Sequence, residues 1–398
     1  MADRLARFHG RWMPEDRAES TYRYLAFELP GGVEGISFTL DYDRGAGVLD
    51  LGLFAPFGFR GWSGGVRSSV IVSRGWATPG YLPGELEPGC WSVCLGLYRI
   101  PDSGLEYTVE VSRLSASPMV EPGERPPLPE RPPRRLLPSL PGRRWLAGDF
   151  HTHSVHSDGA LEIMDLALVA RSRGLDFLAV TDHNTVSHHP YLRELSAYSG
   201  VELLPGQELT TDEGHANCFG RTGWIDFRRD ADQWLSSVER AGGVLSINHP
   251  VDGDLGWRRR TTAVPPLAEV WHSSWDRQSE EPLAWWMRWG CARPIGGSDF
   301  HRVGSDKAPG SPTTWIEVAD DGILPALRTG RVCVSEGPSG PVVMREGSDV
   351  LVIGGEGTWL TSIGGRREPV RSDAARLTAV DGLQLLTDDT GQILALTL

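Results

Sequence analysis

The chain has 398 residues, of which 40% are hydrophobic and 23% are charged, and its formal net charge is −13. This length suggests two or three domains, and the composition is that of a folded globular protein. The negative net charge disfavours non-specific binding to nucleic acid. Lys307 is the only lysine, so a Schiff-base lysine is excluded at every other position.

Membrane and secretion signals are missing from the sequence. A membrane-spanning helix needs about 18 or more consecutive apolar residues, and no such run occurs. The first residues lack the apolar core of a signal peptide. The five cysteines (Cys90, Cys94, Cys218, Cys291 and Cys333) are too scattered for a disulfide framework. We therefore expect a reduced, cytoplasmic protein that makes no contact with membranes.

Both ends of the chain predict β structure. Over residues 20–114, short runs such as YRYLAFEL and CWSVCLGLYRI are separated by Gly, Pro and Asp clusters. Seven or eight strands at this spacing favour a β-sandwich, which we assign to residues 1–115. After about residue 343 the alternation of apolar and polar residues returns, so residues 336–398 predict a small β domain. Scaffolding, oligomer contact and substrate access are all open as roles of the N-terminal domain.

The middle of the chain predicts an α/β domain. Nine prolines between Pro118 and Pro141 indicate an extended linker over residues 116–142. Over residues 143–335, apolar runs alternate with helical patterns, as in parallel β/α proteins. Helices are predicted over Ala160–Ser172, with Ser157 or Asp158 as cap, and over residues 190–198 and 230–241.

Histidines and acids follow the apolar runs of this middle region. Ten of the eleven histidines lie from His151 to His301. His151 and His153 alternate at the end of a strand, so both side chains point to one face. Further His, Asp and Glu residues stand in VTDHN, GQEL, GHANCFG, NHP and GGSDFH. Imidazole and carboxylate groups are ligands that borderline divalent metals prefer, so the pattern predicts a metal-dependent hydrolase.

These segments, together with FHTHSVHSDG, resemble in order and spacing the motifs of the PHP (polymerase and histidinol phosphatase) superfamily over residues 145–335. Within it, the chain resembles the metallohydrolase branch related to carbaryl hydrolase. The resemblance implies a distorted (β/α)7 TIM-like barrel. It also implies two to three divalent metals per chain, for which Zn, Mn and Fe are all open.

The resemblance further implies which residues bind the metals. The first metal is assigned to His151, His153, Glu208 and Asp299, the second to His215, His249 and the shared Glu208, and the third to Asp158, His183 and His301. Several relatives carry His where this chain has Asp158. The carboxylate of Asp158 can also serve as a ligand. For His215 a backbone hydrogen bond is an alternative to metal binding. Asp182 is expected to orient a neighbouring histidine.

The predicted reaction is hydrolysis by a hydroxide that bridges two metals. Glu208, Asp299 and His301 are the predicted catalytic residues. Arg302 can bind a substrate phosphate or form an ordinary salt bridge, and His272 can contact substrate or make a structural hydrogen bond. We predict a small phosphomonoester or phosphodiester as substrate. A carboxylic ester or carbamate on the same metals, and a metal-binding module without activity, are the alternatives.

Overall fold

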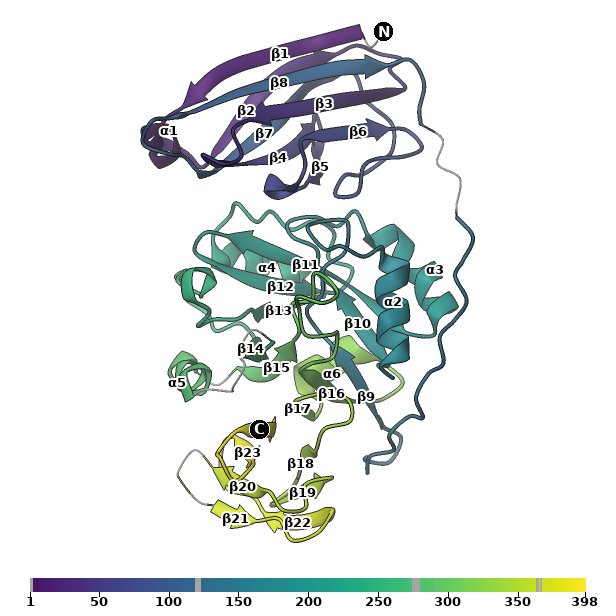
Figure 1. The fold of residues 1–398 in the computed structure, drawn as a ribbon, viewed down its shortest axis with the longest axis vertical. Coiled ribbons are helices and arrows are strands. Elements are labelled where there is room, and N and C mark those ends of the chain that lie inside the picture. Colours follow the sequence, from purple (N-terminus) through teal and green to yellow (C-terminus); the bar gives the residue numbers. More distant parts are fainter. Residues whose placement is uncertain (1–2, 119–122, 274–279, 291, 363–364, 366) are drawn as a thin grey trace. The chain divides into compact units, whose positions relative to one another are not determined.

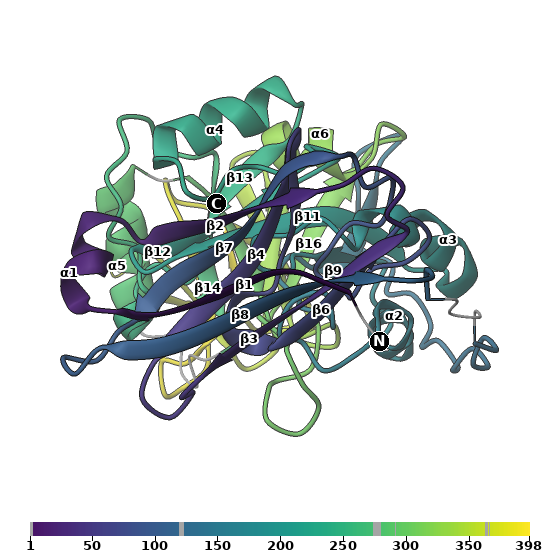
Figure 2. The same cartoon turned by 90° about the horizontal axis from the view of Figure 1, so that it is seen from above.

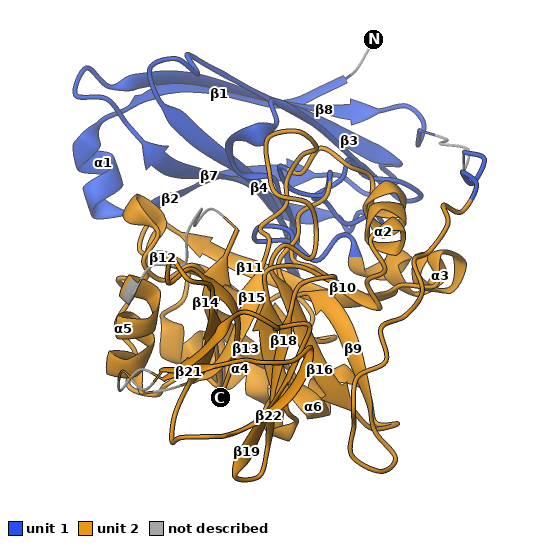
Figure 3. Cartoon of the chain, turned by 60° about the horizontal axis from the view of Figure 1, so that its bottom comes forward, with its two compact units in different colours: residues 1–127, 155–158, 182–188 blue, residues 128–154, 159–181, 189–398 orange. Residues whose placement is uncertain are grey.

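The computed structural model of the protein describes residues 3–118, 123–273, 280–290, 292–362, 365 and 367–398 (Figure 1). These residues form two units, which we describe separately (Figure 3). Unit 1 comprises Met1–Pro127, Val155–Asp158 and Asp182–His188, and unit 2 comprises Leu128–Ser154, Gly159–Thr181 and His189–Leu398.

Unit 1 contains a sandwich of two antiparallel four-stranded sheets (Figures 1 and 2). Its elements are β1 (Asp3–Trp12), α1 (Pro14–Glu19), β2 (Tyr22–Leu29), β3 (Gly35–Tyr42), β4 (Val48–Ala55), β5 (Gly58–Trp62), a 3-10 turn (Gly64–Val66), β6 (Ser69–Ser73), β7 (Gly89–Arg99) and β8 (Leu105–Leu114). The strand orders are β1-β8-β3-β6 and β2-β7-β4-β5. Residues from both sheets, such as Phe38 of β3 and Leu51 of β4, are buried in one shared core. This arrangement is the sandwich that the strand spacing predicts.

Strand β1 lies outside the region in which the sequence predicts strands. It pairs with β8, and Leu5, Phe8 and Trp12 pack against the core of the sandwich. Trp12 stacks on Tyr107 with the ring centroids 5.1 Å apart. The composition does not reveal this strand because arginines alternate with its few apolar side chains, as is common at the edge of a sheet.

Unit 2 is built around one large sheet. Its first strands are β9 (Arg144–Asp149), β10 (Phe177–Val180), β11 (Glu202–Thr211), β12 (Gly214–Phe219), β13 (Val244–Ile247), β14 (Leu267–His272), β15 (Arg293–Gly297), β16 (Thr313–Val318) and β17 (Val332–Ser335). Strands β9 to β11 run parallel, as do β13 to β15, whereas β12 and β16 run antiparallel to their neighbours. The α/β class is thus observed.

The predicted (β/α)7 barrel is not observed in the strand pairing. Among the described residues, no ladder joins β15 to β16 or β17, so β15 ends the sheet. The physical reason lies in β12 and β16, because each pairs antiparallel and interrupts the strand–helix alternation that closes a regular barrel. The large sheet is therefore open and mixed.

Helices connect several strands of unit 2. Three of these helices lie where the sequence predicts helices. The helices are α2 (Ile163–Ser172), α3 (His189–Ser199), α4 (Ala231–Arg240), α5 (Glu280–Trp289) and α6 (Ile323–Thr329), with a 3-10 turn at Gly253–Leu255. The Asp230 carboxylate caps α4 by accepting a hydrogen bond from the Gln233 backbone at 2.8 Å. Helix α2 begins after Glu162, not after Ser157 or Asp158. The predicted cap is wrong because the Ser157 hydroxyl donates a hydrogen bond to Asp182 instead.

The linker and the C-terminal strands complete unit 2. Residues 128–140 form neither helix nor strand, and Arg131 and Arg134 both donate hydrogen bonds to Asp176, at 2.7 and 2.6 Å. The last strands are β18 (Val342–Glu346), β19 (Asp349–Ile353), β20 (Trp359–Ser362), β21 (Arg367–Pro369), β22 (Ala374–Thr378), β23 (Gln384–Thr387) and β24 (Ile393–Thr397). Strands β24, β23, β20 and β21 extend the large sheet through β17, while β18, β19 and β22 form a small sheet. None of the described helices is long and apolar enough to cross a membrane.

Candidate metal centre

The carboxyl ends of several parallel strands bring histidines and acids together in unit 2. The residues concerned are His151 and His153 after β9, Glu208 in β11, His249 after β13, His272 at the end of β14 and Asp299 after β15. Parallel strands present their carboxyl ends at one edge of a sheet, which is why residues distant in sequence meet there. The antiparallel strand β12 adds His215, its second residue, which pairs with Thr210 of β11.

Asp149 fixes the backbone of the two segments that carry most of these groups. Its carboxylate is buried and accepts hydrogen bonds from the backbone of His151 and Ser298, both at 3.0 Å, and of Gly310 at 2.7 Å. Burial raises the pKa of the Asp149 carboxyl, and these hydrogen bonds oppose the rise. One side chain at the end of β9 therefore ties the segment of His151 to that of Asp299.

Four of the predicted ligands converge on one point. The Nε2 atoms of His151 and His153 lie 3.1 and 2.9 Å from Asp299 Oδ1. They lie 3.2 and 3.6 Å from Oε1 and Oε2 of Glu208. Ligand atoms on a tetrahedral cation lie about 3.4 Å apart when the bonds are about 2.1 Å long. The spacing therefore suits one cation, and Asp299, with 21% of its side chain exposed, leaves an approach from solvent.

A second group forms on the other side of Glu208. Its Oε1 atom lies 3.2 Å from Nδ1 of His215 and 3.5 Å from Nε2 of His249. These three residues offer ligand atoms close enough to hold one ion. Oε1 of Glu208 thus faces His215 and His249 of this group and His151 of the first group, while Oε2 faces His153, so the carboxylate lies between the two groups.

The charges of the centre fit divalent cations. Glu208 and Glu269 are buried, and both lie within ion-pair distance of histidines. A buried carboxylate is costly unless a positive charge accompanies it. His151 Nε2 is buried without a hydrogen-bond partner and faces carboxylate oxygens of Glu208 and Asp299. A cation between these atoms would satisfy all of them.

The same field shifts the pKa values of the ligands. Burial opposes a charge on His151, but the carboxylates of Asp299, Glu208 and Glu269 outweigh it and raise the pKa of His151 well above 6.5. The pKa of His249 is raised for the same reasons. Burial acts to raise the pKa of Asp299, but the neighbouring histidines hold it well below its usual range. The centre therefore attracts either protons or metal ions.

This competition predicts a pH dependence of metal binding. The raised pKa values keep His151 and His249 protonated at and somewhat above pH 6.5, and a protonated nitrogen cannot bind a metal. Affinity should therefore fall as the pH is lowered toward 6.5, by about tenfold per pH unit for each proton displaced. Competition with a chromophoric chelator measures the metal affinity at each pH. The control variant His9→Gln, which changes a histidine of β1, should show the same dependence of affinity on pH as wild type. An affinity that does not change with pH would contradict the assignment.

Glu269 is a functional residue that the sequence reasoning missed. It lies within β14, where its Oε1 accepts a hydrogen bond from His151 Nδ1 at 3.2 Å and its Oε2 one from the His249 backbone at 2.8 Å. A Cβ at Gly297 would lie 2.0 Å from Glu269 Oε1, so the neighbouring strand needs glycine there. One feature of the sequence could have indicated it, namely that Glu269 is an acid inside the apolar run LAEVW. A glutamate in a buried strand is rare unless it is paired with another polar or charged group.

His272 is buried at the end of β14. The sequence left two roles open for it, a substrate contact and a structural hydrogen bond. Its Nε2 lies 3.3 Å from Asp299 Oδ2, and it groups with His151 and His249 at ligand distance. His272 is therefore a candidate ligand of the centre, because it ends a buried strand and its ring turns inward.

The remaining predicted residues of unit 2 lie at the edge of the centre. His301 stacks on His153 with the ring centroids 4.2 Å apart, and its Nδ1 donates a hydrogen bond to the Asp299 carbonyl at 2.7 Å. Arg302 is exposed, and its backbone N–H donates to Asp306 at 2.7 Å. Its role in binding a phosphate stays a prediction.

Asp158 and His183 belong to unit 1, where Oδ1 of the first lies 3.5 Å from Nε2 of the second. Burial raises the pKa of Asp50, in β4 of the same unit, to about 7, and the charge of His183 opposes this rise. The assignment of Asp158, His183 and His301 to a third cation stays a prediction.

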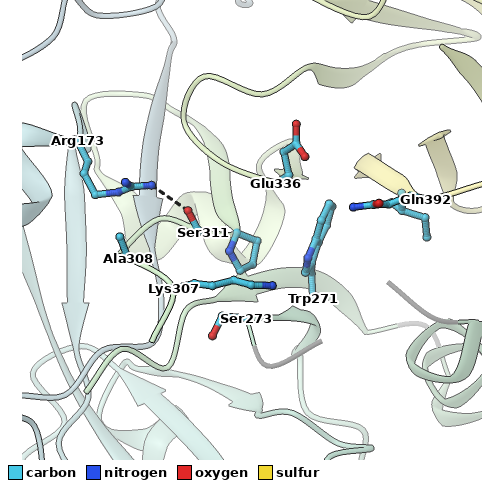
Figure 4. Close-up of a pocket in the computed structure, with 10 residues that line it drawn as sticks. Arg173, Trp271, Ser273, Lys307, Ala308, Ser311, Glu336 and Gln392 are labelled. Carbon is cyan, nitrogen blue, oxygen red and sulfur yellow. Dashed lines mark hydrogen bonds between the residues drawn. The ribbon is translucent and has the colours of Figure 1, made fainter. Parts of the chain in front are cut away.

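A pocket in unit 2, apart from the candidate metal centre, has a volume of about 380 Å³ (Figure 4). Trp271 forms one wall, Lys307 extends toward it, and Arg173 donates a hydrogen bond to Ser311 Oγ at 2.8 Å. Among the residues that line it there is none of the predicted metal ligands. Lys307, the only lysine, thus lies outside the metal centre.

Comparisons with known proteins give partial similarities. No family model matches the chain. The chain is 25% identical over 116 residues to an uncharacterized protein of Methanocaldococcus jannaschii, which covers 26% of this chain and 68% of that protein. It is 34% identical over 64 residues to a 5'-3' exoribonuclease of Haemophilus influenzae, which covers 16% of this chain and 23% of that enzyme.

Solved structures are similar to this chain at low identity. A two-domain protein of Bacteroides vulgatus, which contains a predicted PHP-like metal-dependent phosphoesterase, has a TM-score of 0.45 at 18% identity and covers 68% of this chain and 99% of its own. A candidate metal-dependent phosphoesterase of Bifidobacterium adolescentis has a TM-score of 0.34 at 20% identity, covering 45% and 94%. An amidohydrolase of Chromobacterium violaceum has a TM-score of 0.32 at 18% identity, covering 40% and 89%.

Proposed function

We propose that the protein is a metal-dependent phosphoesterase of the PHP type, which hydrolyses a small phosphomonoester or phosphodiester. The observation that carries this proposal is the convergence of His151, His153, Glu208 and Asp299, whose facing atoms lie 2.9 to 3.6 Å apart. Divalent cations, for which Zn, Mn and Fe are candidates, would supply Lewis acidity and a water that loses its proton near neutral pH.

The chain's own residues have separate tasks in this proposal. Glu208 would serve both ligand groups, since Oε1 faces His215 as well as His151 and Oε2 faces His153. Asp299 completes the first group and is the ligand that solvent reaches. His301, whose side chain is 21% exposed, would act through the predicted third cation, to which it is assigned as a ligand.

A phosphate substrate suits the surroundings of the centre. Arg302 follows His301 directly and is exposed, so its guanidinium can reach an anion that approaches the ligands. The exoribonuclease that matches 64 residues of this chain is named for an activity on phosphodiesters. The motif resemblance to the carbaryl-hydrolase branch makes carboxylic esters and carbamates the second class to test.

Substrate turnover tests the proposal. Purified protein with Mn²⁺ or Zn²⁺ should hydrolyse p-nitrophenyl phosphate or bis-p-nitrophenyl phosphate, and should not hydrolyse 1-naphthyl carbamate at a comparable rate. The Arg302→Ala protein should show a raised KM for the phosphate ester, by roughly 10-fold, and a nearly unchanged kcat, because a phosphate contact acts in binding.

Each other outcome points to one of the alternatives. Carbamate turnover without phosphate turnover would replace the phosphoesterase by an ester or carbamate hydrolase on the same centre. Metal binding without turnover of any of these esters would favour a binding module.

A further inference from the structure

Two short segments of the chain leave the large sheet and join the sandwich. Val155–Asp158 and Asp182–His188 follow β9 and β10 in sequence, yet both belong to unit 1 (Figure 3). Each carries one residue of the predicted third cation, Asp158 in the first segment and His183 in the second. The sandwich therefore contacts the chain next to both of these residues.

Hydrogen bonds from two loops of the sandwich hold the segments. Arg67, just after the turn Gly64–Val66, donates from Nη2 to the Val155 carbonyl at 2.5 Å. The Gly80 backbone forms a reciprocal pair with the second segment, because its carbonyl accepts from Thr185 Oγ1 at 2.8 Å and its N–H donates to Ser187 Oγ at 3.0 Å. Thr185 and Ser187 are buried, so these bonds are shielded from water.

Gly80 also needs to be glycine for contact with the first segment. Its φ is +100°, which L side chains rarely adopt. A Cβ there would lie 2.9 Å from the carbonyl oxygen of Trp62 and 3.0 Å from that of His156. Trp62 belongs to the sandwich, and His156 stands two residues before Asp158. A side chain at position 80 would therefore push the segment of Asp158 away.

The two segments are bound to each other as well. His156 Nδ1 and Ser187 Oγ lie 2.7 Å apart, and the Ser157 hydroxyl donates to Asp182 Oδ1 at 2.7 Å. The other oxygen of Asp182 lies 3.2 Å from His188 Nδ1. These buried contacts make the segments one body, which brings Asp158 to 3.5 Å from His183.

We propose that the N-terminal sandwich is a positioning element for a cation bound by Asp158 and His183, and that Gly80 and Thr185 are its positioning residues. This inference rests on the proposed function and on the predicted cation to which Asp158 and His183 are assigned. Gly80 and Thr185 act through the backbone of the two segments and do not themselves reach the ion.

Metal content of the full chain tests the inference. Wild type and variants are loaded with Mn²⁺, dialysed and measured for ions per chain by mass spectrometry. Gly80→Ala and Thr185→Val should each lose about one ion per chain, as should Asp158→Ala, while the other ions remain. Combining Gly80→Ala with Asp158→Ala should cost no further ion, because both changes remove the same one.

Matched controls separate this effect from damage to the fold. Gly32→Ala changes a sandwich glycine that also has a positive φ, of +77°, but has open space around it, so this variant should keep every ion. Thr185→Ser keeps the hydroxyl and should therefore keep the ion that Thr185→Val loses. If Gly80→Ala does not fold, the Thr185 pair decides the question.

Unchanged ion counts in Gly80→Ala and Thr185→Val, or a larger loss in the double variant than in Asp158→Ala, would overturn the inference. A wild-type chain that binds two ions and hydrolyses phosphate esters would also overturn it, with the proposed function intact. A wild-type chain that binds three ions, loses one in these variants and hydrolyses no ester would support the inference while the proposed function fails.

Discussion

The Glu208→Gln protein is expected to lose the metals of both ligand groups and, with them, ester hydrolysis by roughly 10³-fold or more. Glu208 is the residue whose oxygens face both groups, with Oε1 at 3.2 Å from His215 and Oε2 at 3.6 Å from His153. Glutamine keeps the size of the side chain but has no charge and one acceptor oxygen. Ion content by mass spectrometry and turnover of bis-p-nitrophenyl phosphate should therefore fall together.

A control on the same strand shows whether the loss is specific. Glu202→Gln changes an exposed glutamate at the start of β11, and it should leave metal content and turnover unchanged. The Glu208→Gln protein should remain folded by circular dichroism, because it removes a buried charge and keeps the volume. Retention of all ions and full activity in Glu208→Gln would overturn the assignment of this residue as a bridge.

The candidate centre was accessible from sequence because its residues stand at the ends of apolar strands. His151, His153 and Asp299 follow β9 and β15, and the parallel arrangement brings such strand ends to one edge of the sheet. Glu208 was found in the same way, through the run VELLPGQEL. The pattern predicted most of the residues that meet there, though not Glu269, and the closed barrel expected from the alternation is missing from the strand pairing.

What the sequence did not reveal depends on contacts between distant segments. Periodicity predicts a strand at GHANCF but not that β12 runs antiparallel to both neighbours. Likewise, nothing local shows that Ser157 bonds Asp182 and not a helix end. For His272 the sequence left a substrate contact and a structural hydrogen bond open, and only the three-dimensional structure shows that its ring is buried beside Asp299.

The second large effect is expected from Glu269→Gln, which should weaken metal binding about 10- to 100-fold. Both oxygens of Glu269 accept hydrogen bonds, one from His151 Nδ1–H and one from the His249 backbone N–H. Glutamine has one acceptor oxygen and one NH₂ group. In one of these two contacts its NH₂ group would therefore face an N–H group, and no hydrogen bond could form. Because Glu269 directs Nε2 of His151 toward Glu208 and Asp299, the ring loses the orientation that metal binding needs. Chelator competition gives the affinity.

Glu317→Gln is the matched control, since it removes the charge of another buried glutamate in the same sheet. Glu317 of β16 pairs with Arg331 at 2.5 and 2.8 Å and accepts a hydrogen bond from the Leu140 backbone at 2.8 Å, with no contact to a candidate ligand among the described residues. This variant should lose free energy of unfolding, by about 1–3 kcal/mol, and keep its metal affinity. The two variants should therefore separate stability from metal binding. Equal metal affinity in Glu269→Gln and wild type would show that His151 is oriented by the metal and its other ligands alone.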